Sequence, residues 1–361
     1  MIYFDNAATT RPLPGAFMEY ENAVRNFPYN PSSEHACGQS ARELLEESRK
    51  RIATCMDCEP EEIYFTSTAT EAAALALRSI STVTDDLMVS PFEHHAIDRE
   101  LFDALTSEYG PRKEWAVAQM HSNNETGRIL PWPLKNWKMR FNEARWKRIA
   151  PLWLCDATAA VGHIPVSFKN LGADYLLADG IKFGGVPGAA FLIAKKDAPL
   201  SPLIRGGGQE RGMRSGTENV PAICAMAAAL EWQTEHMEEN TQKIAAMRQM
   251  LFQSLSRISG HKWNTPFEKP CLPHILNVSF DGVDGHALAL LLSKEGVMVS
   301  AGAACSNGKN EPSHVIMAMF NDEARARSAI RISLSHENTP DECVEAAKKI
   351  EEAVLYLRSL N

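Results

Sequence analysis

Two side chains that follow apolar runs of this sequence are candidates for covalent chemistry. Lys182 comes just after ADYLLAD (173–179), and Asp156 ends PLWLCD (151–156). A lysine whose charge is disfavoured by burial can form a Schiff base, although most lysines only solvate a surface. A buried carboxylate needs a positive partner, and a pyridinium nitrogen would be one.

Three further residues have side chains suited to proton transfer, nucleophilic attack and anion binding. His94 follows LMVSP (87–91), where an imidazole can stack on a ring, move a proton or simply hydrogen-bond within its loop. Cys305 lies in the small-residue loop of VMVSAGAACSNG (297–308), where an exposed thiol is available as a nucleophile. Arg331 in AIRISL (329–334) has a planar guanidinium that matches a substrate carboxylate, although a structural ion pair is equally common.

Three polar or glycine-rich segments could contact a bound ligand. Ala69 and Thr70 follow EIYFTS (62–67) at the start of a predicted helix, where N–H groups favour phosphate unless the segment is an ordinary N-cap. Asn124 lies in HSNNETG (121–127), which otherwise indicates a turn. Thr217 lies in RGGGQERGMRSGTEN (205–219), whose glycines let the backbone approach a ligand or another subunit.

The elements that must position these residues alternate between strands and helices. Apolar runs predict strands at 62–67, 87–91, 151–156, 173–179 and 189–196, and helical spacing predicts helices at 39–55, at 68–80 and from about residue 95. This order predicts an α/β fold with a mostly parallel sheet covered on both faces. Ligands of such sheets bind beyond the carboxyl ends of the strands, where the candidate residues fall.

The last third of the chain predicts a smaller α+β unit. A helical stretch at 220–258 is unusually long, which indicates a connector between domains. Strands are expected at 275–282, 297–302 and 329–335, with helices at 285–295 and 340–359. We therefore expect a large domain over 12–240 and a small domain formed by 1–11 and 241–361.

The length, charge and hydrophobic content of the chain are those of a globular protein. The 361 residues, with a net charge of -8 and 45% hydrophobic residues, suit one large and one smaller globular domain. The acidic balance argues against direct nucleic-acid binding. No apolar run reaches membrane-spanning length, and the start MIYFDNAATT lacks the features of a signal peptide, which predicts a cytoplasmic protein.

Two other segments have alternative interpretations. Cys55 and Cys58 form a CxxC pair, but without a second pair we expect free thiols, not a metal or redox site. The basic and aromatic stretch 135–148 predicts an amphipathic surface helix or, as the alternative, a docking face for an acidic partner or RNA.

Together and in this order, the motifs resemble the cysteine desulfurases of the NifS/IscS type, which are pyridoxal-phosphate (PLP) enzymes of the class V aminotransferase family. The resemblance extends from near the first residue to about residue 340. The short AAC loop and the spacing of EPSH resemble the NifS/IscS branch and not the SufS branch. The blocks that carry it are DNAATT (5–10), NPSSEHACGQSAR (30–42), FTSTATE (65–71), EHHA (93–96), NNETG (123–127), DATAAVG (156–162), GGGQERGMRSGTENV (206–220), HILNVSFDG (274–282), SAGAACSNG (300–308), EPSH (311–314) and SAIRISL (328–334).

The resemblance implies a PLP-dependent transferase of fold type I that works as a homodimer. The reaction takes sulfur from L-cysteine, leaving L-alanine and an enzyme persulfide that passes to a sulfur-acceptor protein. Lys182 would bind PLP as a Schiff base, Asp156 would pair with the pyridine nitrogen, and His94 would stack on the ring and help to move protons. Asn124 would contact the ring hydroxyl.

The remaining roles concern the phosphate and the substrate. By the same resemblance, Ala69 and Thr70 would contact the phosphate, and Thr217 would reach it from the neighbouring subunit. Arg331 would hold the substrate carboxylate. Cys305 would attack the substrate sulfur and carry the persulfide.

Four departures from the family pattern fall in the cofactor half of the site. The usual Ser-Gly-His-Lys is Asp179-Gly180-Ile181-Lys182, so that Ile181 cannot donate to the phosphate and Asp179 must point away, pair with a cation or weaken PLP binding. The usual Gln is Ala159, and Gly185-Val186-Pro187-Gly188 lacks a basic residue. The stretch between His94 and Asn123 is short, so part of the large domain's edge, or a strand beside the site, is expected to be missing.

Three functions are compatible with this pattern. The first is a working cysteine desulfurase that serves iron–sulfur clusters or the thio-modification of tRNA or DNA. The second is a non-catalytic scaffold with weak or no PLP binding. The third is a related lyase that acts on selenocysteine or cystine.

Overall fold

The computed structural model describes residues 1–97, 99–106, 114–131, 151–302 and 311–360. These residues divide into two compact units, which we call the large unit (Arg11–His121 and Leu130–Glu235) and the small unit (Met1–Thr10, Ser122–Ile129 and His236–Asn361). The predicted domain boundaries assigned Ser122–Ile129 to the large domain, whereas these residues make their contacts within the small unit. Cys305 and the whole of the basic stretch 135–148 lie outside the described residues.

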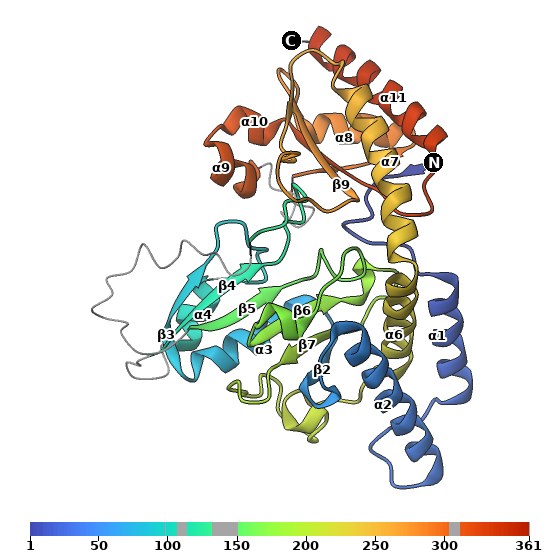
Figure 1. Cartoon of the computed structure of the whole chain (residues 1–361), viewed down its shortest axis with the longest axis vertical. Coiled ribbons are helices and arrows are strands. Elements are labelled where there is room, and N and C mark those ends of the chain that lie inside the picture. Colours follow the sequence, from blue (N-terminus) through green and yellow to red (C-terminus); the bar gives the residue numbers. More distant parts are fainter. Residues whose placement is uncertain (98, 107–113, 132–150, 303–310, 361) are drawn as a thin grey trace. The chain divides into compact units, whose positions relative to one another are not determined.

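The large unit contains a six-stranded sheet with helices on both faces (Figure 1). The strands are β2 (Ile63–Thr66), β3 (Thr84–Val89), β4 (Glu114–Met120), β5 (Leu152–Asp156), β6 (Tyr175–Asp179) and β7 (Ala190–Ala194). The helices are α1 (Pro14–Asn26), α2 (Ala36–Met56), α3 (Ala69–Ser81), α4 (Arg99–Thr106), α5 (Phe168–Leu171) and α6 (Val220–Glu235), with single 3-10 turns at η1 (Pro60–Glu62), η3 (Gly180–Lys182) and η4 (Glu210–Gly212).

The strand order is β2-β7-β6-β5-β4-β3. Strands β3, β4, β5 and β6 are parallel, and β7 runs antiparallel to both β6 and β2. The predicted α/β fold with a mostly parallel sheet is therefore confirmed. Because β3 to β6 run the same way, the segments that follow them emerge at one edge of the sheet.

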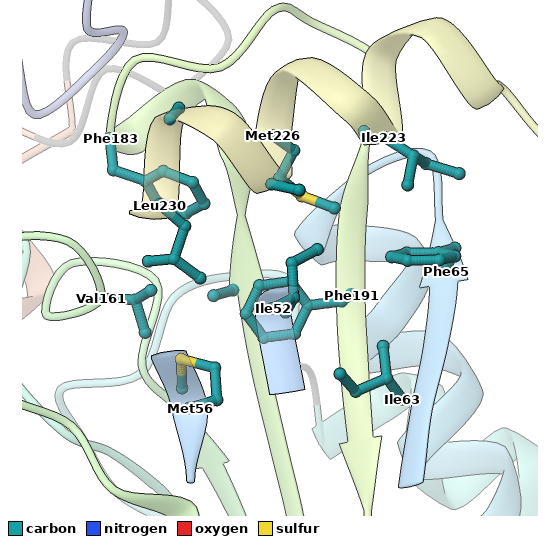
Figure 2. Packing of buried hydrophobic residues seen from close by; sticks show 14 of the residues in the cluster. Ile52, Met56, Ile63, Phe65, Val161, Phe183, Phe191, Ile223, Met226 and Leu230 are labelled. Atoms are coloured by element: carbon teal, nitrogen blue, oxygen red, sulfur yellow. The ribbon is translucent and has the colours of Figure 1, made fainter. Parts of the chain in front are cut away.

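Successive side chains of the strands face two different apolar layers. In β2, Ile63 and Phe65 face the core formed with α1, α2 and α6, whereas Tyr64 faces the core formed with α3 and α4. Figure 2 shows the first of these cores, to which Ile52, Ile63 and Phe191 all belong. In β6, the strand before Lys182, Leu176 and Ala178 face the first core whereas Tyr175 and Leu177 face the second.

Four predictions about single elements were wrong. The helix expected from about residue 95 begins at Arg99, because the His94–Ile97 segment first forms a turn with Ile97 N–H donating to the His94 carbonyl. The helical stretch at 220–258 is two helices that end and begin on either side of His236. Strand β4 lies between β3 and β5, so the short stretch before Asn123 still supplies a strand beside the site. The strand expected at 297–302 is two short strands in different sheets.

The small unit packs helices against two small sheets. A four-stranded sheet has the order β11-β12-β9-β8, and β1 pairs with β10. The hydrophobic core of the small unit contains strand residues such as Val278 and Ile330. It also contains helix residues such as Leu251, Leu288 and Ile350. Its elements are β1 (Ile2–Tyr3), α7 (Met237–Leu255), β8 (His261–Trp263), β9 (Ile275–Phe280), α8 (Gly285–Lys294), β10 (Val297–Met298), β11 (Ser300–Ala301), α9 (His314–Phe320), α10 (Glu323–Arg327), β12 (Ala329–Ser333) and α11 (Pro340–Ser359).

Within the described residues, none of the helices combines the length and the apolar character needed to cross a membrane.

Candidate active site

The carboxyl ends of β4, β5 and β6 bring several polar side chains of the large unit together. Asp156, the last residue of β5, lies opposite Met120 of β4 and Leu177 of β6 in the register of the sheet. The next residue after β4, His121, donates its backbone N–H to the Asp156 carbonyl at 2.7 Å. The residues that the sequence predicted at strand ends therefore lie at one edge.

Two buried carboxyl groups lie there, and the charge of one acts on the other. Asp156 is 8% exposed, and its Oδ1 accepts the Thr158 N–H at 2.9 Å. Glu93 is also buried, and its Oε1 accepts the Met120 N–H at 2.6 Å. Burial and then the negative charge of Asp156 raise the pKa of Glu93 to about 8. A cation bound beside this pair would relieve that repulsion.

Two side-chain atoms beside Asp156 are buried without a hydrogen-bond partner among the described residues. They are His121 Nδ1 and Thr158 Oγ1. Burial lowers the pKa of His121, which favours its neutral form. Buried polar atoms are seldom left unpaired, so these two suit a ligand that has hydrogen-bonding atoms.

Sequence reasoning did not single out Glu93 or His121. The only sequence signal for either residue was its place at the start of the segments EHHA (93–96) and HSNNETG (121–127). Glu93 comes close enough to Asp156 to feel its charge only because strands β4 and β5 pair. A local sequence motif does not show that pairing.

His94 and Lys182 occupy the segments that follow β3 and β6. The Nδ1 atom of His94 accepts the Ala96 N–H at 3.1 Å, so the proton of a neutral imidazole lies on Nε2. Lys182 ends the η3 turn and is half-buried, and its carbonyl lies 3.0 Å from His163 Nε2. The positive charge of Lys182 acts on the neighbouring Asp179 carboxylate.

The N-terminus of α3 is already in contact with two carboxylates. Thr68 is the N-cap residue, and its side chain accepts the Glu71 N–H at 3.2 Å. Glu71 in turn accepts the Ser67 N–H at 3.0 Å and forms an ion pair with Arg214 at 2.6 Å. The Ala69 N–H donates to Asp179 Oδ2 at 3.0 Å. Asp179 therefore does not point away from the predicted phosphate site.

Asp179 also begins the turn that carries Lys182. Its Oδ1 accepts the Ile181 N–H at 3.2 Å, an ordinary N-cap arrangement for aspartate. Burial raises the pKa of Asp179, and the charge of Asp156 acts in the same direction. The N–H groups of Ala69 and Ile181 and the charge of Lys182 oppose the rise without cancelling it.

In the small unit, two predicted site residues are in direct contact. Arg331 is 1% exposed and donates from Nη1 to the Asn124 carbonyl at 3.0 Å. Its Nη2 contacts Asp5 Oδ1 at 2.9 Å and Ser300 Oγ at 3.3 Å, while Nε has no partner among the described residues. The structural ion pair that the sequence left open is therefore present, and the Nε–H of the guanidinium remains for a ligand.

The comparisons with known proteins cover nearly the whole chain. The family model for "Aminotransferase class-V" matches residues 2–110 and 103–345. The chain is 34% identical over 388 residues to "Putative cysteine desulfurase IscS 1" of Bacillus subtilis, which covers 98% of both chains. The chain belongs to the cysteine desulfurases of the class-V aminotransferase family.

Other members of the family agree with this assignment. The "IscS-like cysteine desulfurase" of Mycobacterium tuberculosis is 33% identical, over 97% of this chain and 95% of the relative. The solved structure of a "NIFS-LIKE PROTEIN" has a TM-score of 0.86 at 33% identity, over 98% of this chain and 99% of that one. A NifS-like protein from Rickettsia africae has a TM-score of 0.83 at 28% identity, over 98% and 99%.

The cysteine desulfurases are PLP enzymes, and the large unit fits the ring of that cofactor. The buried Glu93–Asp156 pair suits a protonated ring nitrogen, and the unpartnered atoms of His121 and Thr158 suit a polar ligand. Lys182 lies at the end of the neighbouring strand. The fit differs at the phosphate end, where Asp179 already accepts the Ala69 N–H.

Two predicted site residues are not placed beside the others. Thr217 is exposed on the loop that precedes α6. Cys305 lies outside the described residues. The half-buried Cys55 and Cys58 are free thiols, and no cluster of three or more metal-ligating side chains was found among the described residues.

Proposed function

We propose that this cysteine desulfurase binds PLP on Lys182, converts L-cysteine to L-alanine and leaves a persulfide on Cys305 for a sulfur-acceptor protein. The observation that carries the proposal is the buried pair of carboxylates, Glu93 and Asp156, at the strand end next to Lys182. PLP supplies an electron sink for the bonds of the bound amino acid.

In the large unit, the residues would have the roles that the resemblance to the family implies. Asp156 would pair with the ring nitrogen and keep it protonated. His94 would stack on the ring and carry a proton on Nε2, because Ala96 holds Nδ1 as an acceptor. Ala69 and Thr70 would contact the phosphate at the start of α3.

Two residues of the small unit would also have the roles that the resemblance implies. Arg331 would bind the substrate carboxylate through Nε while its Nη2 stays paired with Asp5. Asn124, whose carbonyl contacts Arg331, would contact the ring hydroxyl. In a homodimer, the exposed Thr217 would reach the phosphate of the neighbouring subunit. We expect the reaction to take place in the cytoplasm.

The sulfur step balances without an added oxidant or reductant. The Cys305 thiolate forms a sulfur–sulfur bond as the carbon–sulfur bond of cysteine breaks. The electron pair of that bond stays with the carbon, which takes up a proton and leaves as alanine. The carbon is thereby reduced by two electrons while the transferred sulfur is oxidised to the level of a persulfide, and a thiol acceptor then removes that sulfur.

The test is alanine release from L-cysteine by the PLP-saturated protein. We expect one alanine per turnover with a reducing acceptor present, and a persulfide on the Cys305 peptide by mass spectrometry. Cys305→Ala should abolish both signals, whereas Cys37→Ser, which removes an exposed thiol, should change neither.

Two outcomes would contradict the proposal. No alanine from PLP-saturated protein would favour the scaffold. Cystine or selenocysteine cleavage that survives in Cys305→Ala, without desulfuration of cysteine, would favour a lyase.

A further inference from the structure

We propose that Asp179 competes with the cofactor phosphate for the N-terminus of α3, so that PLP binds this chain together with one proton taken up by the Asp179 carboxyl group. This inference rests on the proposed function, because it concerns the same cofactor site. It makes Asp179 a determinant of how tightly, and at which pH, the site accepts a phosphorylated cofactor.

The first argument is that the N–H groups at the start of α3 are largely taken. Ala69 donates to Asp179 at 3.0 Å, Glu71 donates to Thr68 at 3.2 Å, and Ala72 donates to the Thr68 carbonyl at 3.1 Å. A phosphate that used the Ala69 N–H would meet the Asp179 carboxylate at the same hydrogen. A phosphate and a carboxylate that share one N–H group would repel each other strongly in a buried site.

The second argument is that Asp179 cannot easily move aside. It is 6% exposed, and its two oxygens accept N–H groups from α3 and from η3. Because Asp179 begins the turn that ends at Lys182, swinging its side chain away would remove the N-cap that positions the lysine. Protonation removes the repulsion and leaves this arrangement in place.

The charges around Asp179 come from each element packed against it. Lys182 of η3 is positive, and Asp156 at the end of β5 is negative. On α3, Glu71 is already neutralised by its ion pair with Arg214, and its pKa is lowered although burial acts against this. Of the two carboxyl groups at the N-terminus of α3, Asp179 is therefore the one that more readily takes a proton, because burial raises its pKa whereas the pKa of Glu71 is lowered.

The consequence is a linkage between cofactor binding and pH. Above the pKa of Asp179, PLP affinity should fall by about tenfold for each pH unit, since one proton must be bound with the ligand. Pyridoxal, which lacks the phosphate, should show no such contribution from Asp179.

The experiment compares the dissociation constants of PLP and pyridoxal for four proteins over a range of pH. The proteins are the unchanged chain, Asp179→Asn, Asp179→Ser and the control Asp174→Asn. Asp174 is also a carboxylate with a pKa raised by burial, and it accepts the Trp153 N–H at 2.8 Å just before the opposite end of β6. Borohydride reduction followed by peptide mapping verifies that PLP is attached to Lys182. Calorimetry in buffers of different ionisation enthalpy measures the number of protons taken up when PLP binds.

We expect both Asp179 variants to bind PLP about tenfold more tightly or better at alkaline pH, and to lose the proton uptake. This gain in PLP affinity should become smaller as the pH falls, and the affinity for pyridoxal should show no such gain. The control Asp174→Asn should bind PLP as the unchanged chain does. Equal PLP affinity of all four proteins at every pH would overturn this inference and leave the proposed function standing. Absence of PLP binding even in the Asp179 variants would overturn both.

Discussion

Single carboxyl groups set the electrostatics of the large unit's site. Glu93, Asp156 and Asp179 are all buried, and each accepts a backbone N–H instead of facing water. A carboxylate removed from water is stable only with donors or positive charge around it. The site therefore favours a ligand that is positive at its ring end, and it resists a second anion at its phosphate end.

Glu93 should make the stability of the PLP-free protein depend on pH. Its pKa is raised from 4.5 to about 8, so the folded state retains a proton that the unfolded state loses in this range. The free energy of unfolding should therefore fall as the pH rises through this range, by up to about 1.4 kcal/mol per pH unit. Urea unfolding of Glu93→Gln at a series of pH values should give a clearly flatter profile; identical profiles would contradict the account.

Removal of one partner of the ion pair between Arg49 and Glu210 should destabilise the large unit strongly. The two side chains are 3% and 1% exposed, with Nη2 and Oε1 2.7 Å apart. Glu210 also accepts the Phe65 N–H at 2.8 Å. Glu210→Ala should lower the free energy of unfolding by about 3–5 kcal/mol, because it leaves a buried guanidinium uncompensated.

A matched control is available in the same unit. Glu21 pairs with Arg25 on α1, where the side chains are 47% and 75% exposed. Glu21→Ala should cost less than about 1 kcal/mol. Similar losses for the two glutamates in denaturant titrations would show that burial does not control the strength of these pairs.

At the scale of elements, two glycines differ in what a methyl group would meet. Gly285 begins α8, and a Cβ there would lie 2.5 Å from the Ala329 carbonyl oxygen of β12. Gly15 lies in α1, where a Cβ would meet nothing within 4 Å. Gly285→Ala should destabilise the small unit by about 1–3 kcal/mol, whereas Gly15→Ala should stabilise the large unit by about 0.5–1 kcal/mol.

Thermal unfolding of both variants measures the difference. A neutral Gly285→Ala would mean that α8 can move away from β12 at no cost, which would contradict the close packing of the two elements.

Most elements could be predicted because their periodicity is local. Strands β2, β5, β6 and β7 are buried apolar runs, and α3 and α11 begin at residues with clear N-cap signals. Strand β4 was missed because its sequence, EWAVAQM, mixes small, polar and apolar residues, and its buried Gln119 is satisfied by the Pro131 carbonyl. The break at His236 has no glycine or proline to mark it.

For the candidate site, the sequence named the residues but not their contacts. The order of motifs identified Lys182, Asp156 and His94 by resemblance. The contact between Asp179 and Ala69 joins residues 110 positions apart, and the pairing of Arg331 with Asn124 joins residues 207 positions apart. Contacts between residues so far apart in the sequence form only when the chain folds. The sequence could therefore show that Asp179 was unusual without showing which group it binds.

At the scale of the whole molecule, most of the described cysteines should be unreactive. Burial raises the pKa of Cys58 and Cys343 to about 12, and it also raises the pKa of Cys55, Cys155, Cys224 and Cys271. Only the thiolate reacts quickly with alkylating reagents. Among these residues, iodoacetamide at neutral pH should therefore modify the exposed Cys37 first.

Peptide mapping after brief alkylation tests this distribution. Fast modification of Cys58 or Cys343 in the folded protein would contradict the burial of these thiols. In Cys37→Ser, the fast-reacting thiol that remains should be Cys305 if it serves as the proposed nucleophile.

The central claim is that the large unit holds PLP on Lys182, and the visible absorbance of the purified protein on addition of PLP tests it most directly. The account predicts a long-wavelength band of the lysine-bound cofactor that is absent in Lys182→Ala and retained in Lys196→Ala, which removes an exposed lysine. No band at saturating PLP, or a band that persists in Lys182→Ala, would contradict it.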